Sequence, residues 1–97
     1  MFIVLLRFAA NRQKAGEFME GHKAWLKRGF DDGVFVLVGS LLPGLGGGIV
    51  AHGVTRAELE TRMSDDPFVA EDVVSVEILE LAPSKTDTRL DFLRGAA

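Results

Sequence analysis

The chain contains no cysteine, and this absence removes several kinds of chemistry at once. Disulfide frameworks, thiolate metal sites and a cysteine nucleophile all require that sulfur. Only two histidines are present, His22 and His52, and neither has carboxylates at the spacing of a metal site. We therefore predict no metal, and we expect no cofactor.

Positive charge is also scarce and scattered. The chain has 11 Lys and Arg residues and 14 Asp and Glu residues, which gives a net charge of −3. Because the basic residues form no patch, nucleic acid is not an expected partner. Long apolar runs are missing too: the opening MFIVLLRFAA carries only six apolar residues before Arg7 and no basic region ahead of them. We expect no membrane partner and a soluble, cytoplasmic protein.

What remains is an ordinary globular composition, with 47% hydrophobic and 26% charged residues. A length of 97 residues predicts one domain over 1–97, with a core at about 2–83 and a C-terminal tail at 84–97. A chain of this size is small enough that dimerisation would help it to bury surface.

The first half of the chain predicts a strand, a long helix and two further strands. An apolar run at 2–8 precedes Asn11, a candidate helix N-cap. Three- and four-residue steps then place one set of residues on a single helix face: Ala15, Phe18, Met19, His22, Trp25, Leu26 and Gly29. Strands are expected at 34–38 and 49–52.

The glycine-rich segment 40–48 between those strands reads as a flexible connection, either a mobile flap over a pocket or a plain hairpin. A phosphate-binding loop is not expected, because the glycines lead into a strand and not into a helix.

The second half predicts a short helix and a last strand. Thr55 and Glu58 form a capping-box pattern, and the helix should end near Ser64. Asp66-Pro67 breaks the helical pattern, a turn is expected at 68–70, and residues 73–81 alternate enough for a strand.

The order β-α-β-β-α-β predicts an α+β fold, the ferredoxin-like split βαβ arrangement, with an antiparallel sheet and both helices on one face. The strands FIVLL and VFVLV are apolar at successive positions, so both of their faces should avoid water. Since the helices cover only one face, we predict a homodimer through the other sheet face.

Two motifs carry a resemblance to a known family. HKAWLKRGFDDG followed by a strand, and DDPFV followed by a strand, resemble the YCII-related (YciI-like) family over 2–83. The resemblance implies a ferredoxin-like domain that dimerises into an αβ barrel. It also implies a proton-transfer pair of His22 and Asp66, with a dehydrochlorinase of chlorinated hydroquinones as the known activity. Where the family often has Gly-Pro or Gly-Ala, this chain has Gly39-Ser40 and the glycine-rich segment.

The chemistry of such a pair is simple, and each residue also has a plain structural explanation. Imidazole takes and returns protons near neutral pH, and a carboxylate orients the ring. That suits elimination or isomerisation and needs no cofactor. A histidine on an apolar helix face is, however, often a satisfied core residue, and Asp66 before Pro67 is an ordinary helix N-cap.

Four further residues are candidates for binding the substrate. Ser40 can offer a hydroxyl at the end of a strand, or belong to a turn. Arg7 can hold an anion, or reach solvent at the sheet end. Trp25 and Phe68 can form an aromatic wall beside His22, or fill the core.

The leading hypothesis is a small dimeric enzyme, a lyase or isomerase, that transfers a proton on a small organic molecule. One rival is a module of the same fold that binds a small ligand without converting it. Another is a structural protein in which His22 and Asp66 satisfy each other. Haem binding is a more distant rival.

Overall fold

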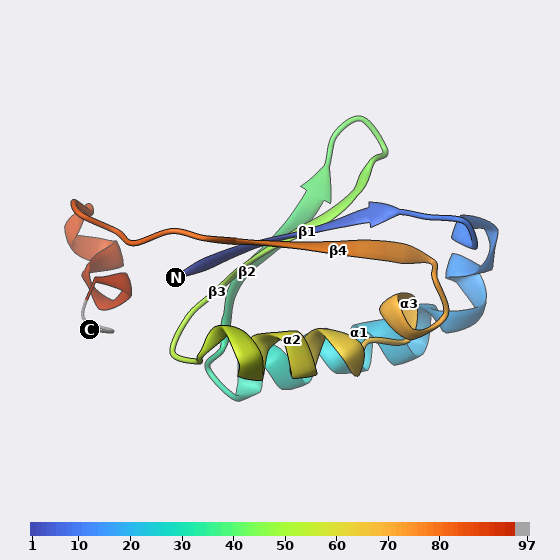
Figure 1. Ribbon diagram of the computed structural model, residues 1–97, viewed down its shortest axis with the longest axis horizontal. Coiled ribbons are helices and arrows are strands. Elements are labelled where there is room, and N and C mark those ends of the chain that lie inside the picture. Colours follow the sequence, from blue (N-terminus) through green and yellow to red (C-terminus); the bar gives the residue numbers. More distant parts are fainter. Residues whose placement is uncertain (95–97) are drawn as a thin grey trace.

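The computed structural model describes residues 1–94, so the last part of the predicted tail, residues 95–97, lies outside the described part. The predicted order of strands and helices is confirmed, with three short helical segments added (Figure 1). The elements are β1 (Phe2–Phe8), η1 (Arg12–Lys14), α1 (Ala15–Asp31), β2 (Phe35–Leu41), β3 (Gly46–Ala51), α2 (Arg56–Ser64), α3 (Pro67–Ala70), β4 (Val74–Glu80) and η2 (Thr88–Leu93).

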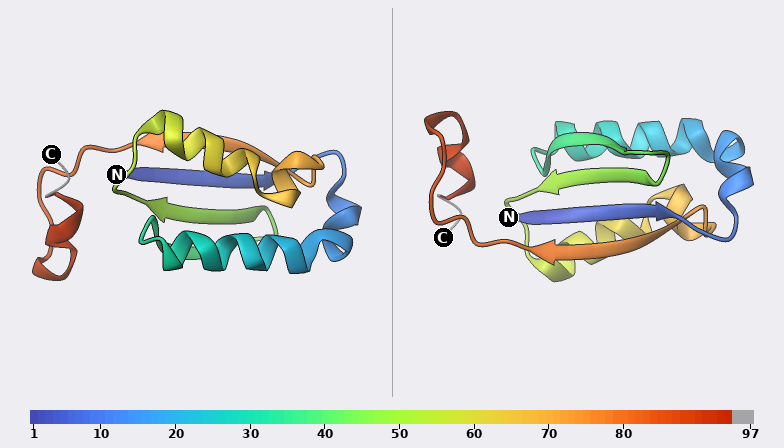
Figure 2. Two further views of the ribbon diagram at one scale, coloured as in Figure 1. Left: turned by 90° about the horizontal axis from the view of Figure 1, so that it is seen from below. Right: turned by 90° about the horizontal axis from the view of Figure 1, so that it is seen from above.

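The four strands form one sheet in the order β2-β3-β1-β4, and all neighbours are antiparallel. Both long helices, α1 and α2, cover the same face, so one view in Figure 2 shows helices in front of the sheet and the other shows bare strands. This is the ferredoxin-like arrangement, and it confirms the predicted fold class. None of the helices within residues 1–94 is long and apolar enough to cross a membrane.

Strand register assigns each residue to one face of the sheet, because side chains alternate along a strand. On the face toward the helices, called the inner face, Ser40 lies beside Gly47, and Gly47 lies beside Leu6. On the opposite, outer face, one row of paired residues crosses all four strands and is entirely apolar. It consists of Leu37, Val50, Ile3 and Leu79.

The core lies between the inner face and the helices. Trp25 of α1 is 1% exposed, and its Nε1–H donates a hydrogen bond of 2.9 Å to the carbonyl oxygen of Arg62. Gly29 lies against Phe35, and a Cβ at position 29 would be 2.0 Å from that ring. The predicted apolar stripe of α1 is therefore correct, and its glycine makes room for the first core residue of β2.

Of the two alternatives for segment 40–48, the hairpin is confirmed, but its strands extend further than predicted and most of the segment is strand. β2 continues to Leu41 and β3 begins at Gly46, and only a four-residue turn with a cis Leu42-Pro43 bond remains between them. Gly46 has φ +135°, and a Cβ there would lie 1.9 Å from the carbonyl oxygen of Leu6. The glycines form a strand because pairing with β1 satisfies their backbone groups.

The N-cap expected at Asn11 is also wrong for α1, which begins three residues later than that cap would place it, after a turn of 3₁₀ helix. The Asn11 side chain makes no cap hydrogen bond and instead donates to the carbonyl oxygen of Glu71, at 2.9 Å. It therefore ties the start of α1 to the loop before β4.

The capping box of α2 is confirmed in both directions. The Glu58 N–H donates to Thr55 Oγ1 at 3.1 Å, and the Thr55 N–H donates to Glu58 Oε1 at 3.0 Å. This backbone hydrogen bond from Thr55 holds the pKa of Glu58 below its usual value. α2 ends at Ser64, as predicted, and Asp66-Pro67 then starts the one-turn helix α3 where a turn was expected.

Candidate functional site

Two side chains from distant parts of the chain meet at one end of the core. His22, in the middle of α1, places its Nδ1 2.9 Å from Oδ1 of Asp66, the residue before α3. Asp66 is fully buried, and the His22 side chain is 15% exposed. The two residues proposed from the sequence as a pair are therefore in direct hydrogen-bonding contact.

Local sequence explains why Asp66 is there. Its Oδ1 accepts the Phe68 N–H at 3.0 Å, which caps α3, and Pro67 occupies the first helical position, where no N–H is needed. Position 21 of α1 is glycine, and a Cβ there would lie 3.0 Å from Pro67 Cγ. Because Gly21 has no side chain, α3 can approach α1 closely enough for Asp66 to reach His22.

The ring of His22 is held by packing as well as by hydrogen bonding. It stacks on Phe68 with 4.0 Å between ring centroids and 5° between planes, and it lies 5.8 Å from the Trp25 ring centroid. When Asp66 is a carboxylate it only accepts hydrogen bonds, and His22 then donates to it through Nδ1–H. In the neutral ring, Nε2 is then left with a free lone pair, and it is the atom able to act as a base.

Asp66 is placed at some energetic cost. Its second oxygen, Oδ2, is buried and has no hydrogen-bond partner among residues 1–94. An unpaired buried polar atom typically costs about 1–3 kcal/mol. Capping α3 requires only one oxygen, and a Ser or Asn at this position would also supply it. The cap alone therefore does not explain a carboxylate here.

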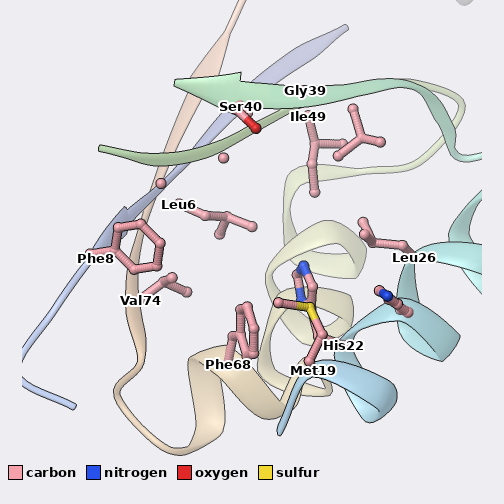
Figure 3. A pocket seen from close by; sticks show the side chains of 15 residues that line it. Leu6, Phe8, Met19, His22, Leu26, Gly39, Ser40, Ile49, Phe68 and Val74 are labelled. Atoms are coloured by element: carbon pink, nitrogen blue, oxygen red, sulfur yellow. The ribbon is translucent and has the colours of Figure 1, made fainter. Parts of the chain in front are cut away.

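A cavity of about 330 Å³ opens beside His22, between α1 and the inner face of the sheet (Figure 3). Most of its lining is apolar and includes Leu6, Phe8, Met19, Leu26, Phe68 and Val74. The polar side chains that line it are those of His22, Lys23 and Ser40. A largely apolar cavity of this size with a few polar groups is typical of sites for small organic molecules.

The structure separates the predicted site residues into two groups. His22, Ser40 and Phe68 line the cavity, and Asp66 lies behind His22. Arg7 does not line it: Arg7 is on the outer face and forms an ion pair with Glu77 at 2.5 Å. Its predicted place in the site was wrong, because odd-numbered residues of β1 point away from the helices.

Trp25 does not line the cavity either, and of its two predicted roles the structure confirms the one in the core. It is three residues beyond His22 on the same stripe but turns into the core, where its indole N–H reaches the end of α2. Sequence reasoning missed Lys23 and the glycines of β3. Periodicity alone puts position 23 outside the apolar stripe, and glycines carry no chemical signal.

Among residues 1–94, no three side chains of the types that bind metals are grouped together. His52 lies elsewhere, at the end of β3, with its ring centroid 5.2 Å from that of Phe92 near the C-terminus.

The comparisons with known proteins differ in what they find. No family model matches the chain, and no curated protein does. The fold is similar to that of 5-chloro-2-hydroxyhydroquinone dehydrochlorinase (TftG) from Burkholderia phenoliruptrix AC1100, solved in complex with 2,5-dihydroxybenzoquinone. The two share 14% sequence identity with a TM-score of 0.70, over 92% of this chain and 98% of the other. At that identity the similarity establishes the fold.

Proposed function

We propose that this protein is an enzyme that removes a proton from carbon in a small organic molecule, with His22 as the base and Asp66 as the residue that orients it. The observation that carries the proposal is the hydrogen bond from His22 Nδ1 to a buried carboxylate, on a ring that also lines a cavity. A histidine that served only packing would not need to border an open, apolar cavity.

The proposed reaction needs no co-reactant, because the substrate supplies the electron pair and either the leaving group or the carbon that takes the proton back. His22 Nε2 takes the proton, and the electron pair of the C–H bond forms a new double bond. In an elimination, a leaving group departs with its own electron pair; in an isomerisation, the imidazolium returns the proton to another carbon. The fold of a dehydrochlorinase supports the first version. Positioned acid-base groups of this kind contribute about 10²- to 10⁴-fold in rate.

The test is exchange of carbon-bound protons with D₂O, followed by NMR over a panel of carbon acids that includes hydroxylated chloroquinols. His22→Gln should reduce exchange about 10²- to 10⁴-fold. His52→Gln is the matched control, because His52 is the other histidine and lies outside the cavity. Equal exchange in wild type and His22→Gln would contradict the proposal. Binding of panel members without any exchange would instead favour a ligand-binding module.

We also propose that two copies pair through the outer face. In a single chain the apolar row on that face is exposed to water: Leu37 is 56% exposed and Leu79 is 44% exposed. An isologous pairing would cover it, because the same row would meet itself. Sedimentation of wild type should give twice the mass of one chain, and Leu37→Glu should give a monomer. A monomeric wild type would contradict this part of the proposal.

A further inference from the structure

We infer that the cavity takes a small organic anion, and that Lys23 binds its negative charge. This inference rests on the proposed function only because both concern the same cavity. Lys23 directly follows His22 in α1 and lines the cavity with it. Lys23 forms no ion pair with any residue from 1 to 94, whereas Lys27, one turn later, is paired with Asp31 at 2.5 Å.

The sign of the charge in the cavity is opposite to that of the whole chain. The protein has a formal net charge of −3, yet among the described residues no carboxylate lines the cavity. Asp66 does not line the cavity and lies behind the His22 ring, with which it shares a hydrogen bond. Lys23 is exposed and borders the cavity, and an ammonium beside an apolar surface attracts an anion more strongly than the same group does in open water. A carboxylate, phenolate or enolate is therefore the expected group.

Lys23 would also assist the proposed reaction. When His22 removes a proton from carbon, negative charge builds up on the substrate. A cation that is already in place stabilises that charge without reorganising. An anionic substituent held by Lys23 would turn the carbon acid toward Nε2, so Lys23 would contribute both to binding and to orientation.

Matched acids and amides of the same shape test this inference by binding alone. Benzoate and benzamide, and the corresponding cinnamate and cinnamamide pair, are titrated into the protein and followed through the NMR signals of residues that line the cavity. The acids should bind more tightly than the amides. Lys23→Met should weaken acid binding about five- to tenfold and leave amide binding unchanged. Lys27→Met is the control and should change neither.

Salt provides a second readout. Acid binding to wild type should weaken as ionic strength rises, and amide binding should not. Equal affinity for acids and amides, or no binding of any acid at millimolar concentration, would overturn the inference. The outcomes separate it from the proposed function: His22-dependent proton exchange with no preference for acids removes only the role of Lys23. Lys23-dependent binding of acids with no exchange on the carbon-acid panel removes only the catalysis.

A different observation carries a second inference: we propose that Gly47 sets the size of ligand that the cavity accepts. Gly47 is on the inner face, where it pairs with Ser40 on one side and Leu6 on the other. The cavity wall that these three residues form therefore has no side chain in its middle. The backbone does not demand glycine there. Its φ is not in the left-handed region, and a Cβ would make an ordinary contact of 3.4 Å with the carbonyl oxygen of Gly39.

The neighbouring residue supplies the control. The backbone of Gly48 also borders the cavity, but a Cβ there would point to the outer face, 3.7 Å from Leu41 Cδ2. Gly47→Val should lower the affinity for 4-isopropylbenzoate relative to benzoate about fivefold or more, because overpacking a filled cavity is costly. Gly48→Ala should leave that ratio unchanged. An unchanged ratio in Gly47→Val, with the variant still folded by circular dichroism, would overturn the inference.

Discussion

Replacing Asp66 tests the hydrogen bonding of the site, because alanine and asparagine remove different parts of the carboxylate. One oxygen, Oδ1, serves both the Phe68 N–H at 3.0 Å and His22 Nδ1 at 2.9 Å. Asp66→Ala removes both interactions. Loss of an N-cap typically costs about 1 kcal/mol, and a buried donor left without an acceptor costs about 1–3 kcal/mol. The free energy of unfolding should therefore fall by about 2–4 kcal/mol.

Asp66→Asn should cost much less. Its amide oxygen can still accept from both donors, and its NH₂ group takes the place of Oδ2, which has no partner among residues 1–94. One unpaired buried group is exchanged for another. The free energy of unfolding should stay within about 1 kcal/mol of wild type.

Urea unfolding at one fixed protein concentration measures both changes. Trp25 is the single tryptophan and is 1% exposed, so its fluorescence reports on the core beside the site. Far-UV circular dichroism provides an independent signal, and a domain of this size loses about 4–8 °C in Tm per kcal/mol. The reasoning would be refuted if asparagine were as destabilising as alanine, or if alanine cost less than about 1 kcal/mol.

Two further predictions concern the helices. The pKa of Glu58 is lowered in the folded state, so its ionised carboxylate stabilises α2 fully at pH values above its usual pKa of 4.5. This stabilisation is lost as the pH falls through the folded-state pKa. The Tm difference between wild type and Glu58→Gln should therefore shrink in acid. A difference that is constant with pH would contradict this. Gly29→Ala should lower the free energy of unfolding by about 1–3 kcal/mol through its clash with Phe35, whereas Gly16→Ala, with open space around it, should raise it by up to about 1 kcal/mol. Urea titrations that gave both variants the same sign would show that packing at Gly29 is not limiting.

Much of the fold could be predicted because its signals are local. The capping box at Thr55 and the break at Asp66-Pro67 each depend on a few adjacent residues, and the apolar stripe of α1 depends on a simple period. The pair of His22 and Asp66 was expected from the resemblance to the YCII-related family, which two motifs carry together. Its geometry also needed Gly21, whose role is visible only once α3 is seen against α1.

The errors occurred where long-range pairing decides the structure. Glycines 46–48 look like a loop in sequence, and only hydrogen bonding to β1 makes them a strand. Arg7 was a candidate for the site because the sequence alone does not show which face of the sheet the odd-numbered residues of β1 occupy. Trp25 shares the stripe with His22, but periodicity does not distinguish a side chain that enters the core from one that borders a cavity.

The alternation along β3 has a consequence for how this protein tolerates insertions and deletions. The backbones of Gly46, Gly47 and Gly48 all border the cavity, but only at position 47 would a side chain point toward it, because positions 46 and 48 face the outer side of the sheet. A shift of the β2–β3 hairpin by one residue against β1 would exchange the side chains that face the cavity with those that face outward. Changes in the length of the four-residue turn are therefore restricted to those that keep each residue of β3 on its present face of the sheet. Gly46 holds the register, because a Cβ at that position would clash with the carbonyl oxygen of Leu6. The residues that face the cavity and those that face outward are thus both set by the register of one hairpin.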